Sequence, residues 1–208
     1  MEEINYLLIV AAAFAAIASP GPATLAIAGT SMSHGRFFGL SLAAGVLTGS
    51  LVWSTAAAFG LAAVLHTNVW VFEILRYCGA LYLLYLAFKS LRSAFNSTPL
   101  DLPRNKTVTV RGHYFKGLLI HLTNPKAILF FGALYSIGVP TTAQPIELLS
   151  VILVVGAVSL LIFLGYAVLF SNRFARQVYL KSKVAFEAVF AVFFGVVGFK
   201  LLTSKIVE

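Results

Sequence analysis

Two proline-containing motifs interrupt long apolar segments and hold the residues best suited to bind a ligand. The sequence SPGPA occupies residues 19–23, and NPK occupies residues 124–126. Proline breaks a helix interior but is tolerated at the first position of a helix, and Ser and Asn are favoured N-caps. Each motif therefore predicts that one helix stops and another starts at its proline. The candidate substrate-binding residues are Ser19, Gly21, Pro22, Ala23, Asn124, Pro125 and Lys126.

The chemistry that such breaks predict is recognition of an anion. The start of a helix has free N–H groups and about half a positive charge, and it binds carboxylates and phosphates. Lys126 adds a full cation at the second break. A charge inside a membrane is costly and is usually functional or paired, so the alternative is a structural lysine bonded to carbonyls of the broken helix.

Three further side chains could carry a proton: His121, Glu187 and Glu73. Histidine titrates near physiological pH, although a lone histidine is more often a structural hydrogen-bonding group. Glu73 is three residues before Arg76 and could form a local ion pair instead. Glu187 lies within an apolar segment, near the end of the span expected to face the cytoplasm.

The elements that position these residues are predicted to be membrane helices. The 208 residues are 60% hydrophobic and only 11% charged, whereas soluble domains contain about 25% charged residues. Six apolar segments separated by polar or turn-forming residues are predicted to span the membrane: 4–32, 37–65, 69–91, 114–138, 146–171 and 184–203. We predict an all-α integral membrane protein with one membrane domain over residues 1–208, and with its first and fourth spans broken.

Charge places the loops on two sides of the membrane. Eleven of the 15 Lys and Arg residues follow or precede spans on the side of the central connection. The positive-inside rule puts that side in the cytoplasm and both termini outside. The N-terminus has two glutamates and no basic leader region, so the first apolar segment is predicted to be retained. The net charge of +8 is explained by this bias and by lipid headgroups rather than by nucleic acid.

The two halves of the chain share a weak internal repeat. A glycine follows the proline by seven residues in both GPATLAIAG and NPKAILFFG, and the third and sixth spans end in AFKSLRS and GFKLLTS. We predict repeat 1 over residues 4–91, a cytoplasmic linker over 92–113, and repeat 2 over 114–203. Because each repeat has three spans, the second must be inverted, as in many secondary transporters.

Other features restrict the function class. The sequence has one cysteine, Cys78, and shows no metal-ligand spacing or nucleophile motif, so we expect no metal, no cofactor and no enzyme. Glycines spaced by four in GRFFGLSLAAGVLTG predict close helix packing, within the monomer or, as a minority interpretation, in a homodimer.

The PGP motif with its glycine-rich following span, together with the NPK segment FKGLLIHLTNPKAILFFGAL, resembles the lysine-exporter (LysE) superfamily, and within it the homoserine/threonine-exporter (RhtB) branch. The resemblance covers essentially the whole chain. It implies proton-driven efflux of amino acids across a bacterial inner membrane, and it implies site roles for Gly21, Pro22, Asn124, Pro125 and Lys126. Ala23 departs from the asparagine found in many relatives, so its side chain offers no polar contact.

The leading hypothesis is a six-helix exporter of small neutral amino acids that works by alternating access. Scarce acidic residues within the spans argue against a cationic substrate. Export of a metal or another ion by the same kind of protein is one alternative. A membrane assembly or sensor module that transports nothing is another.

Overall fold

The computed structural model describes residues 4–67, 69–95, 109–140 and 142–203, and every regular element in these ranges is a helix. The bounds are as follows: α1 Tyr6–Ala18, α2 Pro22–His34, α3 Arg36–Thr67, α4 Val69–Phe95, α5 Val110–Leu122, α6 Pro125–Gly138, α7 Pro145–Phe170 and α8 Arg173–Thr203. The all-α prediction is confirmed for the described residues.

Both predicted breaks are present. The axes of α1 and α2 meet at 53°, and those of α5 and α6 at 58°. Within the described residues, segments of α3 and α7 are long and apolar enough to cross a membrane, and each bent pair can supply one more span. The apolar part of α8 covers Val184–Phe199. These helices make the chain a multi-pass membrane protein.

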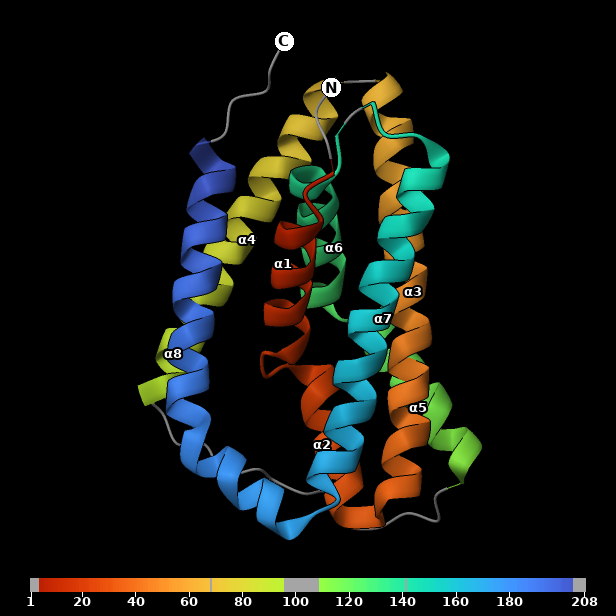
Figure 1. Cartoon of the computed structure of the whole chain (residues 1–208), viewed down its shortest axis with the longest axis vertical. Coiled ribbons are helices and arrows are strands. Elements are labelled where there is room, and N and C mark those ends of the chain that lie inside the picture. Colours follow the sequence, from red (N-terminus) through yellow and green to blue (C-terminus); the bar gives the residue numbers. More distant parts are fainter. Residues whose placement is uncertain (1–3, 68, 96–108, 141, 204–208) are drawn as a thin grey trace.

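The helices run up and down a single bundle, and their ends separate the loops into two sets (Figure 1). The start of α1, the end of α3, the start of α4, the end of α6, the start of α7 and the end of α8 lie at one end of the bundle. The end of α2, the start of α3, the end of α4, the start of α5, the end of α7 and the start of α8 lie toward the other end. This is the division of loops that the sequence predicted. Both helix breaks lie between the two ends, toward the middle of the bundle.

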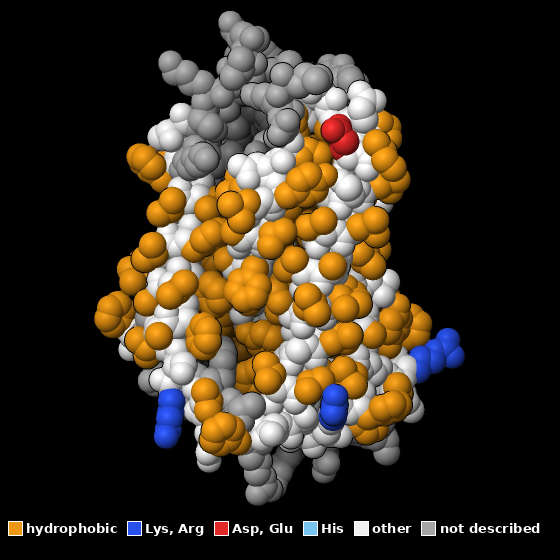
Figure 2. All heavy atoms as spheres, viewed as in Figure 1, with side chains coloured by type: hydrophobic (Ala, Val, Ile, Leu, Met, Phe, Trp, Pro, Cys, Tyr) orange, Lys and Arg blue, Asp and Glu red, His pale blue; other side chains and the backbone are white. Residues whose placement is uncertain are grey.

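The surface is consistent with a lipid environment. On the face seen in Figure 2, apolar side chains cover the length of the bundle, whereas the visible Lys and Arg side chains gather near the end that holds the α2–α3 connection. Described basic residues at that end include Arg36 at the start of α3 and Arg92 in the last turn of α4. The exposed acid Glu147 is in the first turn of α7, at the opposite end.

Glycines bring α3 and α5 into direct backbone contact. A Cβ on Gly45 would clash with the Tyr114 carbonyl, and a Cβ on Gly117 would clash with the Leu42 carbonyl. Gly49 packs in the same way against the side chain of His121. The glycine-rich surface of α3 is therefore used inside the monomer, as the first of the two interpretations expected.

One predicted boundary is wrong. The polar connection SNRFARQVYLKSK, predicted as a loop before a span at 184–203, is mostly helical, because α8 already begins at Arg173. Its Arg, Lys, Gln, Ala and Leu residues are good helix formers, so polarity alone did not indicate a loop. In the range 92–113, predicted as the central linker, α4 continues to Phe95 and α5 starts at Val110.

Candidate functional site

At the second break, between α5 and α6, the first N–H groups of the new helix are hydrogen-bonded to Asn124, a residue of the break itself. Asn124 is the N-cap of α6, and its Oδ1 accepts a hydrogen bond from the backbone N–H of Lys126 at 3.1 Å. The Asn124 carbonyl accepts from the N–H groups of Ala127 at 2.9 Å and Ile128 at 3.2 Å. Pro125 has no N–H, so Asn124 satisfies the first donors of this helix. The expected free N–H groups at the start of α6 are thus already occupied.

The first break is arranged differently. Ser19, predicted as an N-cap, is instead the C-cap of α1, and Gly21 is the N-cap of α2. Gly21 is the N-cap because it directly precedes the first helical residue, Pro22, as Asn124 does before α6. Ser19 lies two residues before Gly21 and so cannot be the N-cap of α2. Gly21 has no side chain to serve as a cap, and its own N–H donates to Thr24 Oγ1 at 2.9 Å. Helix geometry leaves the N–H groups of Ala23 and Thr24 without acceptors inside α2.

Side chains from distant elements complete the end of α1. The Tyr166 hydroxyl, on α7, donates to the Ala18 carbonyl at 2.6 Å. Lys126 Nζ donates to the Ser19 carbonyl at 3.1 Å and also to Ser19 Oγ. Ser19 Oγ in turn donates to the Ala16 carbonyl at 2.9 Å. The carbonyls of Ala16, Ala18 and Ser19, which a helix break could leave without partners, are therefore paired.

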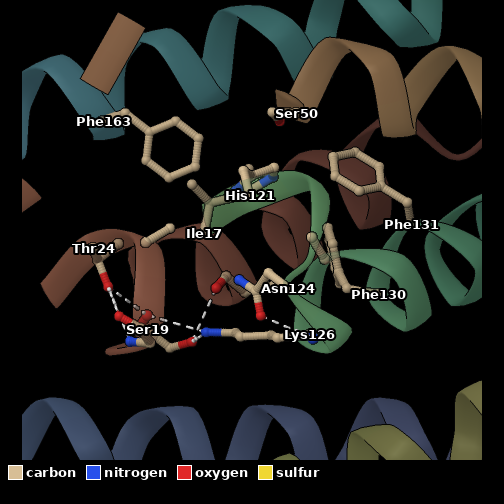
Figure 3. Close-up of a pocket in the computed structure, with 14 residues that line it drawn as sticks. Ile17, Ser19, Thr24, Ser50, His121, Asn124, Lys126, Phe130, Phe131 and Phe163 are labelled. Carbon is tan, nitrogen blue, oxygen red and sulfur yellow. Dashed lines mark hydrogen bonds between the residues drawn. The ribbon is translucent and has the colours of Figure 1, made fainter. Parts of the chain in front are cut away.

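Lys126 connects the two breaks (Figure 3). It belongs to the start of α6, where the helix dipole is unfavourable for a cation, but its ammonium group lies at the carboxyl end of α1, where the dipole is favourable. A Cβ on Gly21 would lie 3.4 Å from Lys126 Nζ, so the ammonium group is also next to the N-cap of α2. The structure brings a full cation and a helix N-terminus to the same place.

A small cavity lies at this junction, and it is lined by Ser19, Gly21, Ala23, Asn124 and Lys126 from the predicted set. Its other walls come largely from apolar side chains, among them Ile17, Phe130, Phe131 and Phe163. The cavity volume is about 30 Å³, which is room for roughly two water molecules. An amino acid needs more space, so binding one requires the surrounding helices to move apart.

Pro22 and Pro125 start α2 and α6 as predicted, but both are exposed and neither lines the cavity. Their contribution is to position the breaks. His121 does line the cavity and is buried. Glu187 is buried on α8 and does not line the cavity. The side chain of Glu73 lies outside the described part of the structure.

Sequence analysis missed three residues near this site. Thr24 occupies the third position of α2, where a side chain can reach back to the N-cap N–H, so the capping-box spacing could have indicated it. Ser50 and Phe163 line the cavity from α3 and α7, and nothing in their local sequence distinguishes them. Among the described residues, no group of three or more His, Cys, Asp or Glu side chains could hold a metal ion.

Comparison with known proteins gives a consistent result. Residues 14–205 match the family described as LysE type translocator. The chain is 30% identical over 135 residues to the threonine efflux protein of Escherichia coli K12, covering 62% of this chain and 66% of that protein, just under two thirds of its length.

Leucine efflux proteins match as well. The one from Enterobacter sp. strain 638 is 33% identical over 184 residues, covering 86% of this chain and 84% of that protein. The one from Salmonella choleraesuis is 36% identical over 141 residues, covering 67% and 66%. No solved structure matches.

Proposed function

Since the chain belongs to the LysE type translocator family, we propose that it is a secondary exporter of small neutral amino acids. The observation that carries this proposal is the position of Lys126, half-buried in the middle of the bundle beside the N-cap of α2. Relatives named threonine and leucine efflux proteins support an amino-acid substrate. The substrate carboxylate binds between Lys126 and the free N–H groups at the start of α2.

Lys126 has donor capacity for this role. An ammonium group has three N–H donors, and two of them reach Ser19. The remaining donor and the N–H groups of Ala23 and Thr24 could together hold a carboxylate. Asn124 contributes indirectly, because its side-chain oxygen is used as the cap of α6. Few acidic side chains accompany the site, which favours a neutral rather than a cationic substrate.

We assign the chain six spans in two inverted repeats, α1–α4 and α5–α8. Helix contacts support this assignment: α3 packs on α5 as α7 packs on α1, and α2 packs on α7 as α6 packs on α3. The contact of α1 with α6 likewise matches that of α2 with α5. Contacts of α2 with α3 and of α4 with α6 lack a comparable counterpart. Exchange of the two repeats between equivalent arrangements would provide alternating access.

The basic end of the bundle faces the cytoplasm in this proposal, and both termini lie outside a bacterial inner membrane. Proton coupling is assigned to Glu187, because it is an acidic side chain buried within the bundle. His121 faces aromatic and small side chains instead. A homodimer would have to use a face other than the glycine-rich side of α3, which is covered within the monomer.

Efflux from proteoliposomes loaded with threonine, homoserine or leucine tests the proposal. The purified protein should move at least one of them, and an imposed pH gradient should accelerate this movement. Glu187→Gln should retain exchange of amino acid across the membrane but lose the acceleration. Wild-type rates that ignore the gradient would rule out proton coupling, and the absence of any amino-acid transport would rule out the exporter.

A further inference from the structure

His121 lines the cavity but takes no part in the hydrogen bonds that stabilise the two helix breaks. The side chain is only 5% exposed, and neither of its ring nitrogens has a hydrogen-bond partner among the described residues. The neighbouring hydroxyl of Ser50 pairs with that of Ser159 at 3.0 Å. Buried polar atoms normally have partners, and leaving one without a partner is costly. The two nitrogens of His121 therefore point to a ligand.

Packing holds the ring in position at the cavity wall. The Phe163 ring meets it edge to face, with ring centroids 5.6 Å apart. A Cβ on Gly49 would lie 2.9 Å from His121 Cβ, so α3 supports the ring from another side. Figure 3 shows His121 with Phe163 and Ser50 nearby, apart from the hydrogen-bonded group around Lys126. The cavity thus has two ends. The Lys126 ammonium group lies at one end, and the His121 ring lies at the other among largely apolar side chains.

We propose that His121 recognises a hydroxyl group on the side chain of the substrate. This inference rests on the proposed export of amino acids: a carboxylate bound at Lys126 directs the amino acid's side chain toward His121. A neutral imidazole has one N–H donor and one bare nitrogen acceptor, and a hydroxyl group can both donate and accept. His121 is thus a specificity-determining residue that selects hydroxyamino acids.

The apolar walls alone would not make this distinction. Ile17 and Phe163 line the cavity and would pack equally well against an aliphatic side chain or a hydroxylated one of the same shape. Valine has nearly the shape of threonine, but it offers no hydrogen bond to either nitrogen of His121, whereas the threonine hydroxyl can pair with one of them. A site built to hydrogen-bond a substrate hydroxyl strongly rejects the analogue that lacks it. Selection therefore depends on the pairing of His121.

The test compares isosteric substrates in proteoliposomes: threonine with valine, and homoserine with norvaline. Wild-type protein should prefer each hydroxyamino acid by about tenfold or more. In His121→Leu this ratio should fall to near one, through slower threonine transport and faster valine transport. His121→Gln, which keeps a donor and an acceptor, should retain part of the preference. His113→Leu is the matched control, because His113 is buried on the same helix but does not line the cavity; its ratio should equal that of the wild type.

A proportional fall of both rates in His121→Leu, with the ratio unchanged, would show a structural or proton-coupling role and would overturn the assignment. Thermal unfolding of the wild type with the same four amino acids gives a measurement that needs no variant. Threonine and homoserine should raise Tm more than valine and norvaline, and equal shifts would overturn the assignment while leaving the exporter intact. Transport of leucine with no transport of these four would overturn this assignment alone, whereas no transport of any of the five amino acids would overturn the exporter and this assignment together.

Discussion

The two helix breaks have similar sequences but are stabilised in different ways. At the α5–α6 break, Asn124 caps the new helix with its own side chain and carbonyl, so the break is complete within a few residues. At the α1–α2 break, the N-cap is Gly21, and the carbonyl end of α1 is completed by Tyr166 and Lys126 from elsewhere in the chain.

This difference indicates which break can respond to a ligand. A self-capped helix start has no free donor to offer, whereas the start of α2 keeps the N–H groups of Ala23 and Thr24. The second break supplies the cation, through Lys126, and the first supplies the backbone donors. In the proposed site, the two breaks therefore have separate tasks.

Removing Lys126 should have the largest effect, because it breaks the link between the two halves. In Lys126→Met, affinity for the amino acid should fall on the order of 100-fold, since a hydrogen bond to a charged group contributes about 1.5–3 kcal/mol. Isothermal titration or counterflow in proteoliposomes measures this loss. Lys116→Met, at an exposed lysine on α5, is the control and should bind normally. Unchanged affinity in Lys126→Met would show that Lys126 does not bind the substrate carboxylate.

Gly21→Val should separate binding from folding at the first break. Gly21 has φ −166° and ψ 177°, an extended backbone that valine before a proline adopts easily. The added side chain would crowd Lys126, whose Cδ and Nζ lie 3.4 Å from the position of a Cβ. Affinity should fall about tenfold, which corresponds to about 1.4 kcal/mol, because the added side chain occupies space beside the ammonium group that the carboxylate needs. Valine is also a poorer N-cap than glycine, so Tm should fall by a few degrees at most. Gly21→Ala should show a smaller loss, and a lower Tm with normal affinity would contradict this role of Gly21.

Asn124→Ala should mainly reduce stability at the second break. Loss of an N-cap costs about 0.5–2 kcal/mol, so Tm should fall by a few degrees. Asn124→Ser restores a capping oxygen and should recover most of the loss. A thermal unfolding series in one detergent measures both variants. If Ser and Ala behave alike, Asn124 acts by some means other than capping.

Tyr166→Phe should give the smallest effect. It removes the hydrogen bond to the Ala18 carbonyl and should cost about 1 kcal/mol of stability at the first break. Tyr114→Phe, which removes the bond to Thr48 Oγ1 away from both breaks, is matched in chemistry. Substrate should protect wild type and Tyr114→Phe from unfolding equally, and Tyr166→Phe less well. Equal protection of all three would mean that ligand binding does not involve the end of α1.

Sequence patterns predicted the breaks and the division of loops because these depend on local rules. Proline at Pro22 and Pro125 cannot continue a helix, and apolar segments of membrane length must cross the bilayer. The start of α8 was misplaced because a basic, amphipathic helix and a polar loop have similar composition. Ser19 was predicted as an N-cap but is the C-cap of α1. The N-cap of α2 lies two residues later, and nothing in the local sequence distinguishes the two roles.

What the sequence determined by itself is where the helices stop and which residues could bind an anion there. Tertiary structure alone decided that Lys126 reaches Ser19, 107 residues away, and that His121 faces Phe163. It also decided that Tyr166, on α7, completes the end of α1. These facts depend on how helices pack across the bundle, and the hydrogen bonds that complete a broken helix are formed by whichever side chains that packing brings within reach.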